Sequence, residues 1–120
     1  MKVGRARVTF LQADEGGAEH SFESGFMTTV GIEGILTPAM VRINSADAAL
    51  PGETHQVEVA FVYIDYVGER LRAFAEITFN QDRRLVARGA ITEVYERRSL
   101  FPSQPPVRAA DAVDDDDVEA

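Results

Sequence analysis

The sequence contains no cysteine, which excludes a disulfide scaffold, a thiolate nucleophile and any zinc or iron–sulfur site with cysteine ligands. No apolar run approaches the ~18 residues that a transmembrane helix requires. The first five residues, MKVGR, lack the apolar core of a signal peptide. These absences predict a cytoplasmic protein without a membrane segment.

The chain also lacks an excess of basic residues, since it has twelve Lys and Arg but twenty Asp and Glu, for a net charge of −8. The residues after Ser99 carry six acids and one base, a net charge of −5, which leaves a net of only −3 for the rest. Neither part has the basic surface that non-specific phosphate binding needs. A nucleic-acid role would therefore require a local patch.

The length of 120 residues predicts one domain, which we place at residues 1–98. Residues 99–120 begin with three prolines (Pro102, Pro105 and Pro106) and continue into an acidic run around Asp114–Asp117. Proline removes backbone donors and the acids repel one another. We therefore expect a disordered acidic C-terminal tail, whose simplest role is to keep the chain solvated.

No segment of residues 1–98 shows a sustained helical period, and several show strand patterns. Residues 4–11 alternate, with Arg5, Arg7 and Thr9 on one face and apolar side chains on the other. Further strands are predicted at 26–36, bent at its glycines, at 40–43 after a turn at Pro38, and at 56–64. A hairpin is predicted between 71–79 and 85–95, turning at 80–82. Six or so strands indicate an all-β barrel or sandwich.

Aromatic side chains divide into two groups in this reading. A barrel this small needs most of its aromatic side chains as core, so core positions are expected for Phe61, Tyr63, Phe74 and Phe79. Tyr66 precedes Val67-Gly68 in a predicted loop and is the better candidate for an exposed binding residue.

Three motifs occur in an order and spacing that together carry a resemblance: FLQADEGG at 10–17, LPGE at 50–53 and RLVARGAITEV at 84–94. The sequence resembles the C-terminal β-barrel, the third domain, of translation elongation factor Tu, over about 90 of its 120 residues. The resemblance implies a small antiparallel six-stranded β-barrel. Each motif alone is only a turn or a strand pattern. The chain looks like a free-standing copy of that barrel.

The resemblance does not extend to the family's GTPase activity or fully to its RNA contacts. No Gly-rich loop ending in Gly-Lys-Ser/Thr is present, so GTP binding is not implied. Where the family has a basic residue after the Gly-Gly loop, this chain has Ala18 and Glu19. The family's Tyr-Arg-Pro-Gln stretch, which contacts aminoacyl-tRNA, is replaced in this chain by Phe-Met-Thr-Thr at 26–29. An acid in place of a phosphate-facing cation predicts weakened tRNA binding.

Catalytic and metal-binding patterns are weak. His20 and His55 lie 35 residues apart and match no ligand motif, so surface or loop-packing roles are expected for both. No serine stands in a Gly-x-Ser-x-Gly motif, and Asp114–Asp117 lack the spacing of a calcium-binding loop. We expect no enzymatic activity, no cofactor and no metal.

The basic residues are nearly all arginine, which suits bidentate recognition of carboxylate or phosphate. Arg5, Arg7 and Arg88 would form one patch if the first and last strands are neighbours, although cross-strand ion pairs are the simpler expectation. The candidate partner-binding residues are Arg5, Arg7, Arg83, Arg84, Arg88, Gly16, Gly17, His20 and Tyr66.

The leading functional hypothesis is a non-enzymatic module that binds another protein. The family's barrel docks against a neighbouring domain and against the nucleotide-exchange factor, so competition for a partner of elongation factor Tu is one form of this hypothesis. The alternative is an RNA- or tRNA-binding barrel that uses the arginine patch, with affinity that falls steeply as salt rises. A small-ligand barrel or an enzyme is a third reading without a supporting motif.

Overall fold

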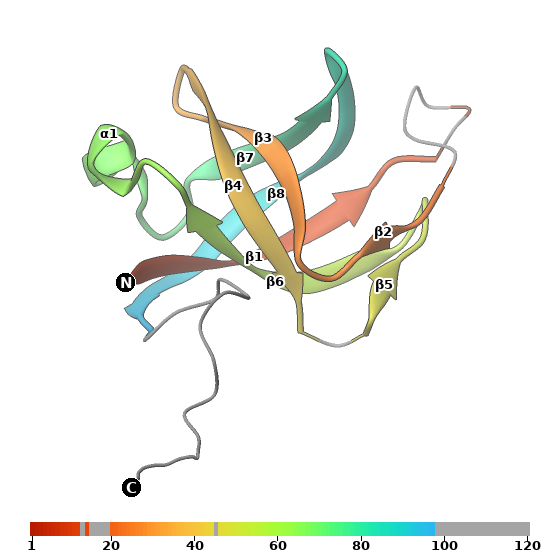
Figure 1. Cartoon of the computed structure of the whole chain (residues 1–120), viewed down its shortest axis with the longest axis horizontal. Coiled ribbons are helices and arrows are strands. Elements are labelled where there is room, and N and C mark those ends of the chain that lie inside the picture. The colour runs from red at the N-terminus through yellow and green to blue at the C-terminus, as the bar shows by residue number, and fades with distance from the viewer. Residues whose placement is uncertain (13, 15–19, 45, 98–120) are drawn as a thin grey trace, which may run out of the picture.

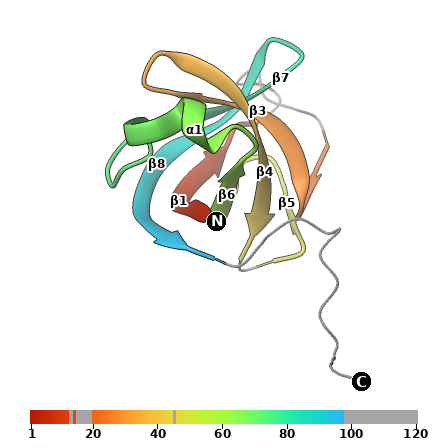
Figure 2. The ribbon, with the colours of Figure 1, turned by 60° about the vertical axis from the view of Figure 1, so that its left-hand side comes forward.

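The structure is a computed structural model that describes residues 1–12, 14, 20–44 and 46–97. The predicted tail at 99–120 and the Gly16-Gly17 loop lie outside these residues. Six strands close into an antiparallel barrel in the order β1-β6-β4-β3-β7-β8, with β8 returning to β1 (Figures 1 and 2). The expectation of a small six-stranded antiparallel β-barrel is confirmed.

The barrel strands are β1 (Lys2–Phe10), β3 (Phe26–Ile32), β4 (Ile35–Ile43), β6 (Thr54–Phe61), β7 (Glu76–Gln81) and β8 (Arg84–Glu96). Two short strands, β2 (Phe22–Glu23) and β5 (Ala48–Ala49), pair with each other beside the barrel. A single helical turn, α1 (Ile64–Val67), and a 3₁₀ turn, η2 (Gly68–Arg70), lie between β6 and β7. Neither of these described helices is long and apolar enough to span a membrane.

The barrel interior is filled by the alternating side chains of the strands. On β1, Ala6, Val8 and Phe10 are fully buried while Arg7 and Thr9 face outward, as the sequence pattern predicts. Phe10 packs against the rings of Phe22, Phe26 and Phe79 at centroid distances of 5.5, 6.4 and 6.2 Å. This aromatic cluster closes one end of the core.

The segment predicted as one bent strand at 26–36 is two strands, so this prediction is wrong. Glu33 and Gly34 both have positive φ, 45° and 87°, and form the two-residue turn between β3 and β4. Such a turn matches the twist of antiparallel strands. Pro38 does not start a turn but lies inside β4. The β4–β6 ladder begins one residue later at Ala39, so the missing N–H of Pro38 falls beyond it.

The hairpin between β7 and β8 forms as predicted, but its bounds differ. The turn consists of Asp82 and Arg83, both with positive φ, and Gln81 pairs with Arg84. Arg84 therefore belongs to β8. The predicted strand over 71–79 begins only at Glu76, because residues 71–75 form turns tied to β8 by Phe74 N–H, which donates to Ile91 O at 2.7 Å.

Two aromatic residues predicted in the core are exposed. Strand β6 ends at Phe61, where its partner β4 ends its ladder at Ala39, and the chain then turns into α1. Tyr63 is consequently 59% exposed. Phe74, which lies in the turns before β7, is 86% exposed. Phe61 and Phe79 are buried as predicted. The alternation of the sequence continued past the point where strand pairing stops.

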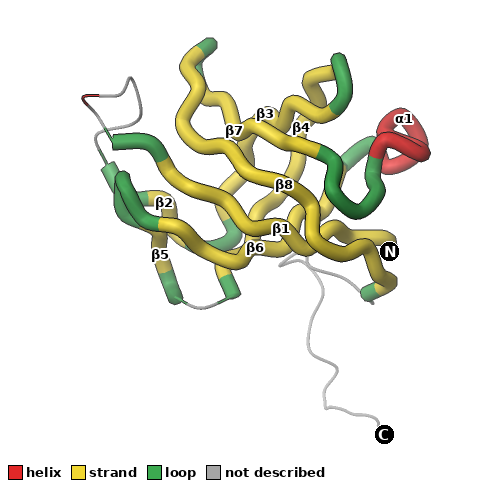
Figure 3. The backbone as a smooth tube through the Cα atoms, turned by 180° about the vertical axis from the view of Figure 1, so that it is seen from behind, coloured by secondary structure: helices red, strands yellow, loops and turns green. Residues whose placement is uncertain are grey.

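Strand β8 is long enough to pair with both β7 and β1, and Gly89 pairs with Ile77 on one side and Val8 on the other. A Cβ atom at Gly89 would lie 2.0 Å from the carbonyl oxygen of Arg7. Only glycine permits this close approach of two backbones. The pairing of β8 with β1 closes the barrel, and β1 lies between the C-terminal part of β8 and β6 (Figure 3).

Candidate functional site

The first and last strands of the barrel are neighbours, which is the condition for the predicted arginine patch. Arg7 pairs with Ala90, and Thr9 pairs with Arg88, so Arg7 and Arg88 are diagonal neighbours on the outer face. Such neighbours lie roughly 7–8 Å apart. Both side chains are exposed, and neither forms an ion pair within the described part of the chain. Arg7 and Arg88 thus share a surface.

Arg5 is also on this face of β1, but it belongs to a different arrangement. The strand register aligns Glu93, Arg5, Glu58 and Arg42 side by side across β8, β1, β6 and β4. Charges of opposite sign therefore alternate across four strands. Arg5 Nη1 donates to Glu93 Oε1 at 2.9 Å, so the expected cross-strand ion pair is present here.

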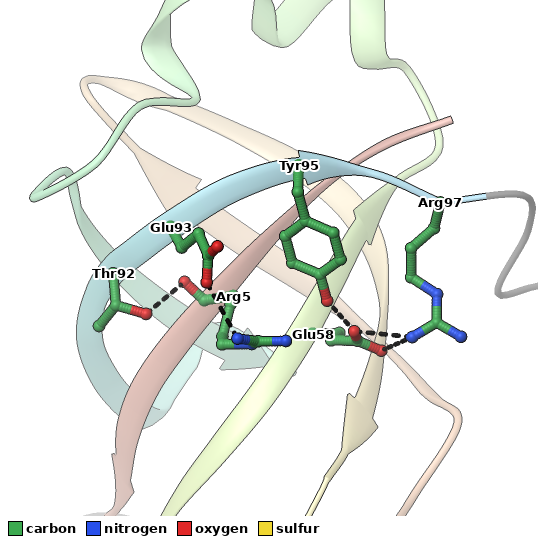
Figure 4. Close-up of polar contacts among 6 residues, drawn as sticks. All are labelled: Arg5, Glu58, Thr92, Glu93, Tyr95 and Arg97. Atoms are coloured by element: carbon green, nitrogen blue, oxygen red, sulfur yellow. Dashed lines mark hydrogen bonds and ion pairs between the residues drawn. The ribbon is translucent and has the colours of Figure 1, made fainter.

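Glu58 is the centre of this row, and its side chain is only 3% exposed. Arg97 Nη1 donates to both carboxylate oxygens of Glu58, at 2.9 and 2.8 Å, and the hydroxyl of Tyr95 donates to Oε2 (Figure 4). The guanidinium of Arg5 lies 5.0 Å from the centre of the Tyr95 ring. Arg97 N–H donates to Met1 O at 2.7 Å, which holds the end of β8 against β1.

A polar cleft of about 630 Å³ opens beside Glu58, and we name it the arginine cleft. Its charged lining residues are Arg5, Arg42, Arg97, Glu58 and Asp47. Arg42 forms no ion pair with any residue that the structure describes, and the Nε of Arg5 is buried without a hydrogen-bond partner. The chemistry of this cleft suits an anionic group with planar oxygens.

The other predicted arginines lie elsewhere. Arg83 forms the tip of the β7–β8 hairpin and Arg84 begins β8. The 13-residue strand β8 runs from this hairpin to the other end of the barrel (Figure 1), and Arg97 follows its last residue, Glu96. The hairpin arginines therefore do not join the arginine cleft, and Arg72, predicted on a strand, lies in the turn before β7 and pairs with Glu33.

The two histidines lie apart, His20 in the loop before β2 and His55 on β6. His20 is exposed, its Nδ1 lies 2.9 Å from Ser21 O, and its ring packs at a tilt against the ring of Phe22. His55 Nε2 lies 2.8 Å from Glu53 Oε1. The Leu50 N–H, and secondarily His55, hold the pKa of Glu53 below its ordinary value. Within the described residues, no group of three or more His, Asp or Glu side chains is placed to hold a metal ion.

Large apolar side chains are exposed at one end of the barrel, which we name the apolar end. They come from β4, from α1 and the residues just before it, and from the turn before β7. The members are Leu36, Val62, Tyr63, Tyr66 and Phe74. Val62 N–H donates to Pro38 O at 3.2 Å, and Arg72 pairs with Glu33, so these segments are held together. Tyr66, a sequence-predicted binding residue, is 57% exposed here.

Phe74 is the most exposed large apolar residue among those described. Its φ of 72° lies in the left-handed region, which a bulky aromatic residue rarely adopts. The Phe74–Ile91 hydrogen bond fixes this conformation. In the alternation of the strand that follows, Phe74 falls on the same side as Glu76 and Thr78, opposite the buried Ile77 and Phe79. The pattern therefore agrees with its exposure, but it does not predict the positive φ.

A groove of about 1200 Å³ joins Phe74 to Leu36, which is 67% exposed. Between them lie the small residues Gly31 and Ala90, and Arg88 also lines the groove. Arg88 is therefore the one predicted arginine that faces both the apolar end and the surface shared with Arg7. The groove combines apolar residues with three charged ones, Arg88 and the acids Glu33 and Glu76.

The chain matches no protein-family model and no curated protein sequence.

Proposed function

We propose that this chain is a non-enzymatic protein-binding module of the cytoplasm, and that the apolar end is its docking surface. The observation that carries the proposal is Phe74, which combines a left-handed backbone with an exposed aromatic side chain. Without a bound partner, both features raise the free energy of the folded chain. Strained residues and exposed apolar clusters concentrate at binding sites, where a partner repays that cost.

The composition of the apolar end indicates a protein rather than a polyanion as the partner. Tyrosine and phenylalanine are enriched in the centres of protein interfaces and contribute large buried areas there. Tyr63, Tyr66 and Phe74 provide these side chains, and Arg88 supplies a charge at the edge of the groove. The matching partner surface carries an apolar side chain that enters the groove and an acid that faces Arg88.

The lack of a catalytic role is supported by the placement of the titratable groups. His20 contacts the backbone of Ser21, and His55 on β6 pairs with Glu53 just before that strand. The buried Glu58 is saturated by Tyr95 and Arg97. These groups serve the fold in the described part of the chain.

The resemblance to the third domain of elongation factor Tu suggests which partner to test first. A barrel of this shape with a docking surface at one end fits competition for a partner of that factor, such as its nucleotide-exchange factor. Titration of the purified exchange factor with the fluorescently labelled chain tests this finer proposal. Binding that the intact elongation factor displaces supports it, and no binding at micromolar concentrations contradicts it.

RNA binding is the second candidate, because Arg7 and Arg88 are adjacent and without ion pairs to described residues. Arg83 and Arg84 on the hairpin extend the reach of such a surface. Glu76 lies in the same row as Arg7, however, and Glu93 neutralises Arg5, so acids interrupt the arginines. Polyanion binding through these residues would weaken steeply with salt.

Capture from cell lysate with the full chain as bait separates the two classes. The experiment uses low and moderate salt, with and without nuclease. Recovery of one protein in stoichiometric amount that survives nuclease and moderate salt is the expected result. Recovery of RNA that disappears with salt contradicts the proposal and favours the arginine surface.

A further inference from the structure

The arginine cleft holds more hydrogen-bond donors than the described residues satisfy. Both carboxylate oxygens of Glu58 accept hydrogen bonds from Arg97, and Glu93 accepts one from Nη1 of Arg5. The buried Nε of Arg5 then has no acceptor, and the guanidinium of Arg42 has no ion-pair partner in the described part of the chain. A buried donor without an acceptor is rare in folded proteins and points to a group that completes the site.

The missing group is an anion with carboxylate-like geometry. Three arginines line the cleft against two acids, Glu58 and Asp47, and Glu58 is already paired. A guanidinium presents its donors in a planar fork that matches two carboxylate oxygens. Ser24 and Asn44 at the rim add polar contacts. A cleft of about 630 Å³ has room for a carboxylate side chain.

We propose that the acidic C-terminal segment of this same chain, Asp111 to Glu119, docks in the arginine cleft. The described chain ends at Arg97, which itself lines the cleft. Asp111 follows Arg97 by fourteen positions, a length that spans up to roughly 46–50 Å when extended. As a random coil the same length averages about 20 Å end to end. The segment therefore reaches the cleft without strain on the barrel.

Charge and tethering favour this occupant over a free acidic peptide. Six carboxylates lie within nine residues, so several registers offer an acid to Arg42 and Arg5. A short covalent tether gives an effective concentration in the millimolar range, so weak intrinsic binding is enough for substantial occupancy. The docked segment covers Arg5, Arg42 and Arg97 and competes with any other anion for them.

This inference is independent of the proposed function, because the cleft and the apolar end share no residue. The absence of cysteine makes its test direct, since Ala112→Cys provides a single attachment point for a nitroxide label on the full chain. We expect the label to lower the amide NMR signals of Arg42, Asn44 and Asp47 at least about twofold relative to those of the β7–β8 hairpin at low ionic strength. The signals should recover at about 0.5 M salt, where the Debye length is a few ångströms.

Two comparisons decide whether the contact is the one proposed. Replacing Asp114–Asp117 by asparagine keeps the length and the label but removes four charges, and should abolish the effect. Arg42→Gln should also abolish it, whereas Arg83→Gln, at an equally exposed arginine on the hairpin, should not. The proposal is overturned if signal loss is uniform over the barrel, persists at high salt or with the asparagine variant, or centres on the hairpin.

Discussion

Arg97 Nη1 lies 2.8 Å from Oε2 and 2.9 Å from Oε1 of Glu58, so one guanidinium nitrogen bridges both oxygens of a buried carboxylate. Tyr95 donates to the same carboxylate from the outer face of the barrel. Glu58 thus fastens the last residues of β8 onto β6, across β1. The barrel seam is closed by this contact as well as by backbone pairing.

Glu58→Gln is expected to destabilise the chain by about 2 kcal/mol, because charge-assisted hydrogen bonds from Arg97 and Tyr95 are weakened in a buried setting. Urea unfolding followed by circular dichroism measures the change. Glu93→Gln is the matched control, since Glu93 is exposed and ion pairs of exposed acids contribute at most about 0.5–1 kcal/mol. Equal losses for the two variants would contradict the role given to Glu58.

Gly89→Ala is expected to destabilise the barrel by more than about 3 kcal/mol, because the added Cβ would overlap the carbonyl oxygen of Arg7. Thermal unfolding compares it with Gly34→Ala. Gly34 has a positive φ but open space around its Cβ position, so alanine there should cost only about 1 kcal/mol. A tolerated alanine at 89 would show that β8 does not approach β1 as closely as described.

Phe74→Asn is expected to leave the folded state as stable as the original chain, or more stable by up to about 1 kcal/mol. Asparagine tolerates the left-handed region better than phenylalanine, and the ring buries little area. Chemical denaturation measures this difference. A loss of more than about 1 kcal/mol would mean that the Phe74 ring supports the fold, which would weaken its assignment to binding.

The contacts of Glu53 predict that the folding stability of the chain depends on pH. The N–H of Leu50 and the side chain of His55 lower the pKa of Glu53 from its ordinary value of 4.5. Because the folded chain favours the carboxylate, this group adds stability above that pH and loses its contribution as the pH falls through the lowered pKa. Glu53→Gln should therefore be less stable than the original chain near neutral pH.

The stability difference between Glu53→Gln and the original chain should shrink as the pH falls below 4.5. Denaturant titrations over this range measure it. Glu23→Gln, at an exposed acid on β2, is the control and should show no such trend. A difference that stays constant with pH would contradict the Leu50 and His55 contacts.

The sequence predicted the barrel because the alternation on β1 and the hairpin pattern are local signals. It also allowed the pairing of β1 with β8 to be anticipated as the condition for an arginine patch. The buried Glu58 was not recognised as a structural centre, since its partners Tyr95 and Arg97 lie 37 and 39 residues away in the sequence. Only barrel closure brings them together.

Phe74 and Tyr63 were misplaced for other reasons. Tyr63 continues the alternation of Val57, Val59 and Phe61, and a single sequence does not show where a strand loses its partner. Phe74 is predicted in the core because a small barrel needs aromatic core residues, although it alternates with the outward Glu76 and Thr78. The structure ends β6 at Phe61 and begins β7 at Glu76. The aromatic residues between these bounds are therefore presented at the apolar end, where they form the candidate docking surface.

The most direct test of the docking surface is a quantitative comparison of the protein captured by three full-length baits: the original chain, Phe74→Asn and Met27→Ser. Met27 is an exposed apolar residue on β3 that does not line the groove and serves as the matched control. The account predicts that Met27→Ser retains the captured protein while Phe74→Asn loses at least about tenfold, the effect of removing an aromatic hot spot of about 1.4 kcal/mol or more. Equal recovery by all three baits, or recovery that follows RNA instead, would contradict it.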